Sequence, residues 1–214
     1  VKIEQAKNMQ IVNCWVCELP NSIELIGGEN IVVKNCQLGA QPTGITCKVQ
    51  EVNKLSFINN QVYPDGRENL VLDACNNCVI EGNNFKSYYN GILVLNGNDN
   101  TVNKNIFWLT GAVQNQLLDH GDDFGIINVK GNNNMVASNS LSCEWAYAGA
   151  VTVNAVQGTG NVFKNCFVDN LESYRVFLVN AQTEVSNCVS SDKVSIVESV
   201  SYTHLRAHET SAHL

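Results

Sequence analysis

The chain repeats one short phrase eight times along its length. In each copy an apolar residue is followed three positions later by Asn or Cys, and two positions after that usually by another apolar residue. Apolar and polar residues alternate within the phrase with the period of two that is typical of β-strands. The shared Asn or Cys falls on Cys14, Cys36, Asn60, Asn83, Asn105, Asn139, Asn165 and Cys188.

The spacing of these copies constrains the fold more than any other feature. Successive copies lie 22, 24, 23, 22, 34, 26 and 23 residues apart, and a second β-rich run precedes most of them. Such a period, holding at least two short strands, is typical of coils that stack in parallel on copies of themselves. We therefore predict an all-β fold, a right-handed single-stranded parallel β-helix of about eight coils. Leucine-rich repeats have a similar period, but they require a leucine-dominated consensus and a helical return, which the sequence lacks.

The polar member of the phrase suits the inside of a coil. An inward-facing Asn at a bend can satisfy the backbone of its own turn and bond the Asn of the coils above and below it, which gives a ladder. The chain has 31 Asn among its 214 residues, enough to supply such a ladder. A Cys at the same position behaves as a small apolar side chain, so we expect the ladder thiols to be inert.

One domain accounts for the repeat, and the end of the chain departs from it. We assign residues 1–198 to the β-helix and residues 199–214 to a tail that the strand phrase does not reach. Residues 200–210 resemble the translation of a sequencing-library adapter, so the tail and its histidines are excluded from fold and function. Neither end offers a cap for the last coil, so an uncapped fragment is expected.

Charge and hydropathy exclude several classes of partner. The formal net charge is −7 and only 15% of residues are charged, which removes the attraction that non-specific binding to nucleic acid or to anionic membranes needs. No apolar run approaches the roughly 18 residues of a membrane span. We expect no nucleic-acid partner and no membrane partner.

Two intervals are longer than the rest, and the extra residues carry acidic and aromatic side chains. Insertions in solenoids are displaced to one face, which usually binds the ligand. Carboxylates can accept hydrogen bonds from sugar hydroxyls, and flat aromatic faces cover the apolar face of a sugar ring. Solvated loops of chance composition are the alternative. The candidate carbohydrate-binding residues are Asp122, Asp123, Trp108 and Trp145.

The cysteines and histidines do not form a recognisable metal motif. Cys75 and Cys78 have the spacing of a Cys-x-x-Cys pair, but no second pair and no nearby His complete a zinc site. The one histidine before the tail, His120, is expected to be a loop residue. We predict neither a metal nor a cofactor.

Several segments, in order, resemble the inulin fructotransferases, bacterial β-helix enzymes that form difructose anhydrides. The stretch from Gly121 to Asn134 is similar to the later coils of that family, as are the segments Ser138–Leu141 and 158–162. Upstream, residues 82–92 and Ser22–Leu25 follow the same family order. The resemblance runs from about residue 5 to about residue 190. It implies a lyase-type reaction without water on a β-2,1 fructan, with no cofactor and in a homotrimer. An extracellular or periplasmic location is compatible with this chemistry.

The resemblance also implies a catalytic pair, of which this chain keeps one member. The family's glutamate falls on Glu18, which would protonate the leaving oxygen. The family's aspartate falls on Lys7, and a lysine cannot act as a carboxylate. Glu18 alone would otherwise be interpreted as a solvent-facing carboxylate. Three functions stay open: a fructotransferase-like enzyme or an incomplete copy of one, a non-catalytic carbohydrate-binding or assembly β-helix, and another β-helix polysaccharide lyase.

Overall fold

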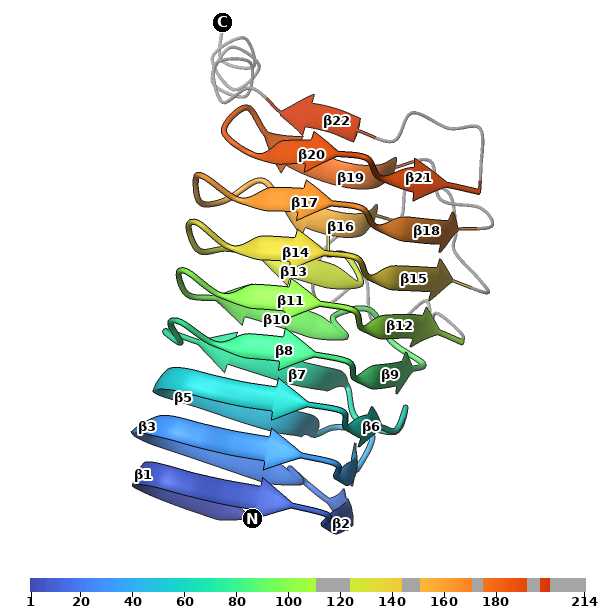
Figure 1. Cartoon of the computed structure of the whole chain (residues 1–214). Coiled ribbons are helices and arrows are strands. Elements are labelled where there is room, and N and C mark those ends of the chain that lie inside the picture. The colour runs from blue at the N-terminus through green and yellow to red at the C-terminus, as the bar shows by residue number, and fades with distance from the viewer. Residues whose placement is uncertain (111–123, 144–150, 171–174, 192–196, 201–214) are drawn as a thin grey trace, which may run out of the picture.

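The computed structural model describes residues 1–110, 124–143, 151–170, 175–191 and 197–200. All regular secondary structure in these ranges is β, and the strands stack coil upon coil along one axis (Figure 1). Every strand pair is parallel. The predicted all-β parallel β-helix is therefore confirmed. The predicted tail contributes only the end of the last strand, and residues 201–214 lie outside the described ranges.

The larger sheet has 14 strands and bends around the coil. Its first three strands are long and cover two faces, and β5 pairs with both β7 and β8. Later coils break each long strand into two shorter ones. The strands are β1 (Lys2–Val12), β3 (Ile23–Lys34), β5 (Ile45–Ile58), β7 (Glu68–Asp73), β8 (Val79–Glu81), β10 (Leu93–Asn96), β11 (Thr101–Asn103), β13 (Ile127–Val129), β14 (Met135–Ala137), β16 (Val151–Ala155), β17 (Val162–Lys164), β19 (Arg175–Asn180), β20 (Glu184–Ser186) and β22 (Val197–Val200).

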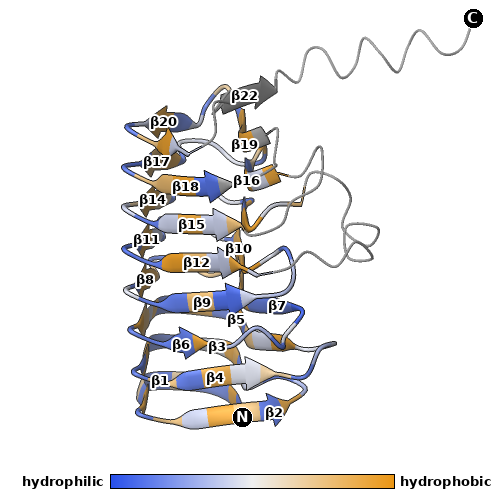
Figure 2. Cartoon of the chain, turned by 90° about the vertical axis from the view of Figure 1, so that its right-hand side faces the viewer, coloured by the Kyte–Doolittle hydropathy of each residue, from blue (hydrophilic) through white to orange (hydrophobic). Residues whose placement is uncertain are grey.

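The smaller sheet has eight strands, one from each coil, and Figure 2 shows it from its outer side. Its strand order follows the chain, so each coil adds one strand next to that of the coil before. The strands are β2 (Trp15–Leu19), β4 (Gln37–Ala40), β6 (Gln61–Val62), β9 (Asn84–Ser87), β12 (Ile106–Leu109), β15 (Ser140–Cys143), β18 (Phe167–Asn170) and β21 (Val189–Ser190).

The predicted ladder lies at the corner between the two sheets. The side-chain oxygen of Asn83 accepts hydrogen bonds from the backbone and the side-chain nitrogen of Asn60, at 2.8 and 3.0 Å, and Asn105 repeats this arrangement one coil further on. Each amide also donates to a backbone carbonyl of an earlier coil, as Asn83 does to Phe57 at 2.8 Å. These side chains are almost wholly buried, so the ladder satisfies polar groups that water does not reach.

The predicted position of one rung was wrong by a single residue. Cys166, and not Asn165, occupies the seventh rung, because Phe167 pairs with Ser140 and the amide of Asn139 contacts the Cys166 sulfur at 4.0 Å. Asn165 takes the left-handed turn conformation just before the rung, with φ of 54°. The slip arose because Asn is the residue type expected at both positions, while successive residues of a strand point to opposite faces.

A second buried ladder marks the other end of the short strands β8, β11, β14 and β17. It was not predicted. Each member accepts a hydrogen bond from the backbone nitrogen of the member one coil earlier, at 2.8 to 3.1 Å. Its members are Cys78, Asn100, Asn134 and Asn161.

An apolar column fills the space between the sheets. Phe57, Phe85 and Phe107 stack with ring centroids 6.1 and 5.0 Å apart, and all three are buried. Burial of a continuous column of this kind is the main stabilising contribution in a solenoid. The described part of the structure holds no helix long and apolar enough to cross a bilayer.

Candidate functional site

A cavity of about 450 Å³ opens at the corner where the smaller sheet of the first three coils ends. Two of its lining residues are carboxylates, Glu18 from the first coil and Asp65 from the third. Their backbones are two rungs apart, which at about 4.8 Å per rung leaves space for a sugar ring between the side chains. The lining residues are Cys17, Glu18, Gly39, Ala40, Gln41, Pro42 and Asp65.

A β-bulge places Glu18 in this cavity. Along β2 and β4, Val16 pairs with Leu38, but the next pair is Leu19 with Ala40, so β2 holds one residue more than its partner. Glu18 lies in this bulge with φ of 64°. Bulges are frequent next to active sites because they change the direction in which a side chain points.

The left-handed conformation of Glu18 is not part of the coil pattern. The 16 other non-glycine residues with positive φ recur at equivalent corners of successive coils, and most of them are Asn. They form three rows: 13, 35, 59, 104, 138, 165 and 187; 8, 30, 54, 77, 99 and 133; and 5, 51 and 74. Glu18 belongs to none of these rows. A left-handed conformation costs a residue with a Cβ roughly 1 kcal/mol, and such strain is concentrated at functional sites.

Residues of the second coil hold the bulge and keep the cavity open. The side-chain amide of Gln41 donates to the Glu18 carbonyl at 3.2 Å, and its backbone nitrogen donates to the Leu19 carbonyl at 2.9 Å. Gly39 forms part of the wall. A Cβ there would lie 3.3 Å from the Cβ of Tyr63 and 3.5 Å from the sulfur of Cys17, so a side chain would reduce the space between them.

The thiol of Cys17 senses both carboxylates. Burial raises its pKa first, a hydrogen bond with Trp15 opposes this, and the negative charges of Glu18 and Asp65 raise it further. Cys17 therefore stays protonated at neutral pH. Because both charges act on one sulfur, the two carboxylates share one local environment.

An aromatic and cationic column continues from the cavity along the outer face of the smaller sheet. Successive coils contribute Tyr63, Lys86 and Trp108; Lys86 and Trp108 are direct strand neighbours. The Lys86 ammonium lies 4.3 Å from the Trp108 ring centroid, and the Tyr63 hydroxyl donates to the side-chain oxygen of Gln37 at 2.9 Å. Flat side chains in such a column can carry sugar rings, because ring C–H groups pack on aromatic faces.

The structure brings together only part of the predicted site. Glu18 lines the cavity and Trp108 lies on the same sheet, four coils along. Lys7 lies on β1 opposite Glu29, in the other sheet, and does not line the cavity. The remaining predicted binding residues, Asp122, Asp123 and Trp145, lie outside the described residues.

Asp65 was not predicted, although the sequence holds a signal for it. Pro20, Pro42 and Pro64 are 22 residues apart, and each marks the same corner of a successive coil. Residues beside these prolines must therefore lie close together, and Asp65 directly follows the third. Gln41 directly precedes the second.

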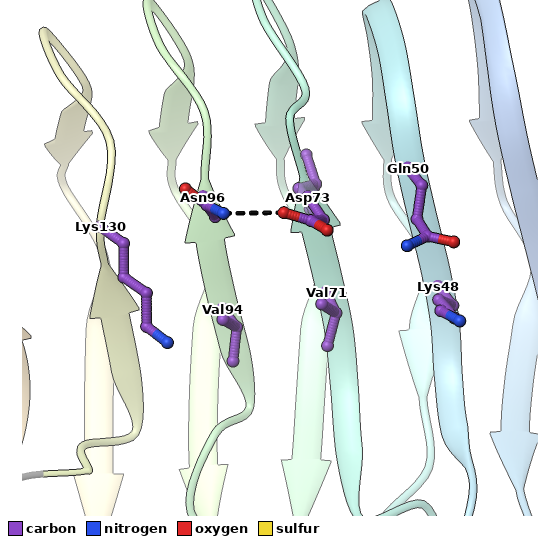
Figure 3. A pocket seen from close by; sticks show the side chains of 8 residues that line it. Lys48, Gln50, Val71, Asp73, Val94, Asn96 and Lys130 are labelled. Atoms are coloured by element: carbon purple, nitrogen blue, oxygen red, sulfur yellow. Dashed lines mark hydrogen bonds between the residues drawn. The ribbon is translucent and has the colours of Figure 1, made fainter.

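A smaller cavity of about 230 Å³ lies on the outer face of β5, β7, β10 and β13 (Figure 3). Val71 and Val94 form its floor, and the side-chain amide of Asn96 donates to an oxygen of Asp73 at 2.7 Å. Lys48 and Lys130 lie at its two ends (Figure 3). Its apolar floor and hydrogen-bonding rim could support a sugar ring, but it contains a single carboxylate and so lacks the pair found around Glu18.

Metal-binding side chains do not gather in the described ranges. No group of three or more His, Cys, Asp or Glu side chains is placed there to share an ion. All four histidines, His120 and the three of the tail, lie outside these ranges.

Solved structures of similar fold come from one bacterium, Arthrobacter chlorophenolicus A6. DFA-IIIase in complex with DFA-III superposes with a TM-score of 0.79 at 21% identity over 92% of this chain and 54% of that one. DFA-IIIase without its lid gives 0.77 at 22% identity over 90% and 55%, and the lidless enzyme in complex with GF2 gives 0.76 at 23% identity over 92% and 53%. The chain thus spans about half the length of these enzymes, and the likeness shows the β-helix fold.

Sequence comparison gives the family. No curated protein sequence matches the chain. The profile of one family, described as "Periplasmic copper-binding protein (NosD)", matches residues 3–184, which include the ladder rungs from Cys14 to Cys166 and the cavity around Glu18. The chain therefore belongs to the NosD family of β-helix proteins.

Proposed function

We propose that the protein is a carbohydrate-active β-helix that acts on β-2,1 fructan by intramolecular fructosyl transfer and releases a difructose anhydride. The observation that carries this proposal is the placement of Glu18, held in a strained bulge inside a cavity that a second carboxylate also lines. Paired carboxylates across a sugar-sized space are the usual equipment of glycosyl transfer.

The two carboxylates would divide the chemistry between them. Glu18 would act as the general acid and protonate the leaving oxygen of the fructosyl linkage. Asp65 would stabilise the oxocarbenium-like centre and accept the proton of the attacking hydroxyl, which belongs to the same difructosyl unit. Asp65 would thus supply the carboxylate that the chain lacks at Lys7.

Two further observations support a fructan substrate. The sequence resembles the inulin fructotransferases from the first coil to the last ladder rung, and the DFA-IIIase structures of similar fold hold DFA-III and GF2, which are fructan oligosaccharides. The column of Tyr63, Lys86 and Trp108 would extend the site along the coil axis and bind further sugar units of the chain.

Copper chemistry does not enter this proposal. Copper in proteins takes thiolate, thioether and imidazole ligands. The described residues hold no cluster of three such side chains, and the buried thiols are held in the two ladders or among apolar side chains. These residues do not fit a copper centre with three or more ligands, and we derive no step through one.

The product of the reaction tests the proposal. Incubation of the protein with inulin should release difructose anhydride, measured by chromatography, and Asp65→Asn should reduce its formation by roughly 10²-fold or more because the attacking hydroxyl loses its base. Lys7→Asp should leave the rate unchanged, because Lys7 lies outside the cavity.

Other outcomes would contradict this assignment in defined ways. Release of free fructose would show hydrolysis in place of intramolecular transfer. Binding of inulin without any product would favour the non-catalytic carbohydrate-binding β-helix. A gain of activity in Lys7→Asp would show that the pair is Glu18 with position 7 and not with Asp65.

Trp108→Ala tests the outer column. We expect the affinity for inulin oligosaccharides, measured by calorimetric titration, to fall roughly 5- to 20-fold, because a stacking face worth about 1–2 kcal/mol is lost. Phe167→Ala is the matched control, since Phe167 is also an exposed aromatic residue of the smaller sheet, two coils further on. Equal losses in both variants would show that the column has no special role in binding.

A further inference from the structure

The ladder between the two sheets changes its chemistry at both ends. Asn fills the four central rungs, whereas the first two rungs are Cys14 and Cys36 and the last two are Cys166 and Cys188. Register makes the members of each thiol pair direct neighbours in successive coils, because Trp15 pairs with Gln37 and Phe167 pairs with Val189. The ladder thus ends in a pair of adjacent thiols on each side.

The thiol rungs lack the links that join the amide rungs. Between Asn60 and Asn83, two hydrogen bonds to one amide oxygen connect the coils. A thiol has no such oxygen, and Cys36 makes only long contacts, at 3.3 and 3.6 Å, to the carbonyls of Lys34 and Ile11. At both ends of the ladder, successive coils are therefore joined at this corner by backbone hydrogen bonds and weak thiol contacts alone.

The members of each pair are placed to react with each other. Neighbouring rungs of a parallel sheet bring Cα atoms to about 4.8 Å, within the roughly 4.4–6.8 Å that a disulfide spans. Each of the four thiols donates to the carbonyl two residues before it, at 3.3 to 3.5 Å, so both members of a pair point the same way.

The last pair is also activated. A hydrogen bond from Cys188 lowers the pKa of Cys166. A thiolate forms most readily where a neighbour stabilises its charge, and the thiolate is the species that attacks a disulfide.

We propose that Cys14 with Cys36, and Cys166 with Cys188, form two disulfide bonds between successive coils when the protein meets a disulfide oxidant. In each pair one thiolate attacks the oxidant, here oxidised glutathione, and displaces one glutathione thiolate. The partner thiolate then attacks the mixed disulfide and displaces the second. Two cysteine thiols and one oxidised glutathione become one protein disulfide and two reduced glutathiones. An oxidising compartment supplies such an oxidant.

These bonds would replace the missing amide links with covalent ones. Each closes a loop of 22 residues and joins coils at the ends of the ladder, where a stacked array opens first. One member of each pair, Cys14 or Cys188, is only half-buried and gives the oxidant access. By contrast, burial raises the pKa of Cys75 to about 11 and that of Cys78 to about 12, so this pair should remain reduced.

Peptide mapping after oxidation tests the proposal without any substitution. The folded protein would be treated with oxidised glutathione, its free thiols alkylated, and its peptides identified by non-reducing mass spectrometry. Of nine cysteines, five should be alkylated (9 − 4 = 5), and the linked peptides should contain 14 with 36 and 166 with 188. The apparent Tm should rise by roughly 5 to 15 °C and return on reduction.

Serine variants assign the effect to each pair. Cys14→Ser and Cys188→Ser should each remove one link and part of the rise in Tm, whereas Cys17→Ser, which alters a half-buried thiol outside the ladder, should retain both links. Nine alkylated cysteines after oxidation, or links that involve Cys75 and Cys78 instead, would overturn the proposal. Neither result bears on the chemistry proposed for Glu18.

Discussion

Asn83→Ala should lower the free energy of unfolding by about 3–5 kcal/mol, the largest effect on stability that we expect from a single polar side chain here. The side chain of Asn83 takes part in four hydrogen bonds. Its oxygen accepts two from Asn60, and its nitrogen donates to Phe57 and Asn105. Alanine would leave the Asn60 backbone N–H and the Phe57 carbonyl buried without these partners, and each such group costs about 1–3 kcal/mol.

Urea unfolding of three variants measures this effect. Asn84→Ala is the matched control, because Asn84 is the next residue but is half-buried on the outer side of β9; its cost should stay below about 1 kcal/mol. Asn83→Cys should cost less than Asn83→Ala, because the ladder uses Cys at four of its rungs. Equal costs at positions 83 and 84 would show that the ladder does not stabilise the coil stack.

The sequence predicted the coil and its ladder because both are periodic. Seven of eight proposed rungs coincide with the column in the structure, and the eighth slipped from Cys166 to Asn165. The second ladder escaped prediction for a physical reason. With 31 Asn in the chain, many amides lie at turns, and composition alone does not separate the inward amides of Asn100 and Asn134 from the outward ones.

The site could be predicted only in part, since it is the place where the chain departs from its own period. Glu18 was identified through a family resemblance, and its bulge has no signature in the spacing of apolar residues. Asp65 comes from a turn two coils away, and only the column of prolines connects the two positions. The interval that carries Asp122 and Asp123 is the longest departure from the period, and its role in binding stays a prediction.

The second large effect concerns Glu18 itself, where activity and stability should move in opposite directions. Glu18→Gln removes the proposed acid but keeps the shape and the backbone, so the rate of difructose anhydride formation should fall about 10²- to 10⁴-fold with stability unchanged. Glu18→Gly should abolish activity equally and raise the free energy of unfolding by about 0.5–1 kcal/mol, because glycine adopts a φ of 64° without a Cβ penalty.

A matched glycine substitution separates the site from the general effect of relieving backbone strain. Ser138 has φ of 55° at a regular ladder corner, where its exposed side chain is far along the chain from the cavity. Ser138→Gly should therefore gain similar stability and keep full activity. A residue retained in a strained conformation at a cost in stability, and needed only for activity, is expected where function and not folding selects the side chain. Full activity in Glu18→Gln would remove that explanation for the bulge and, with it, the assignment of the acid.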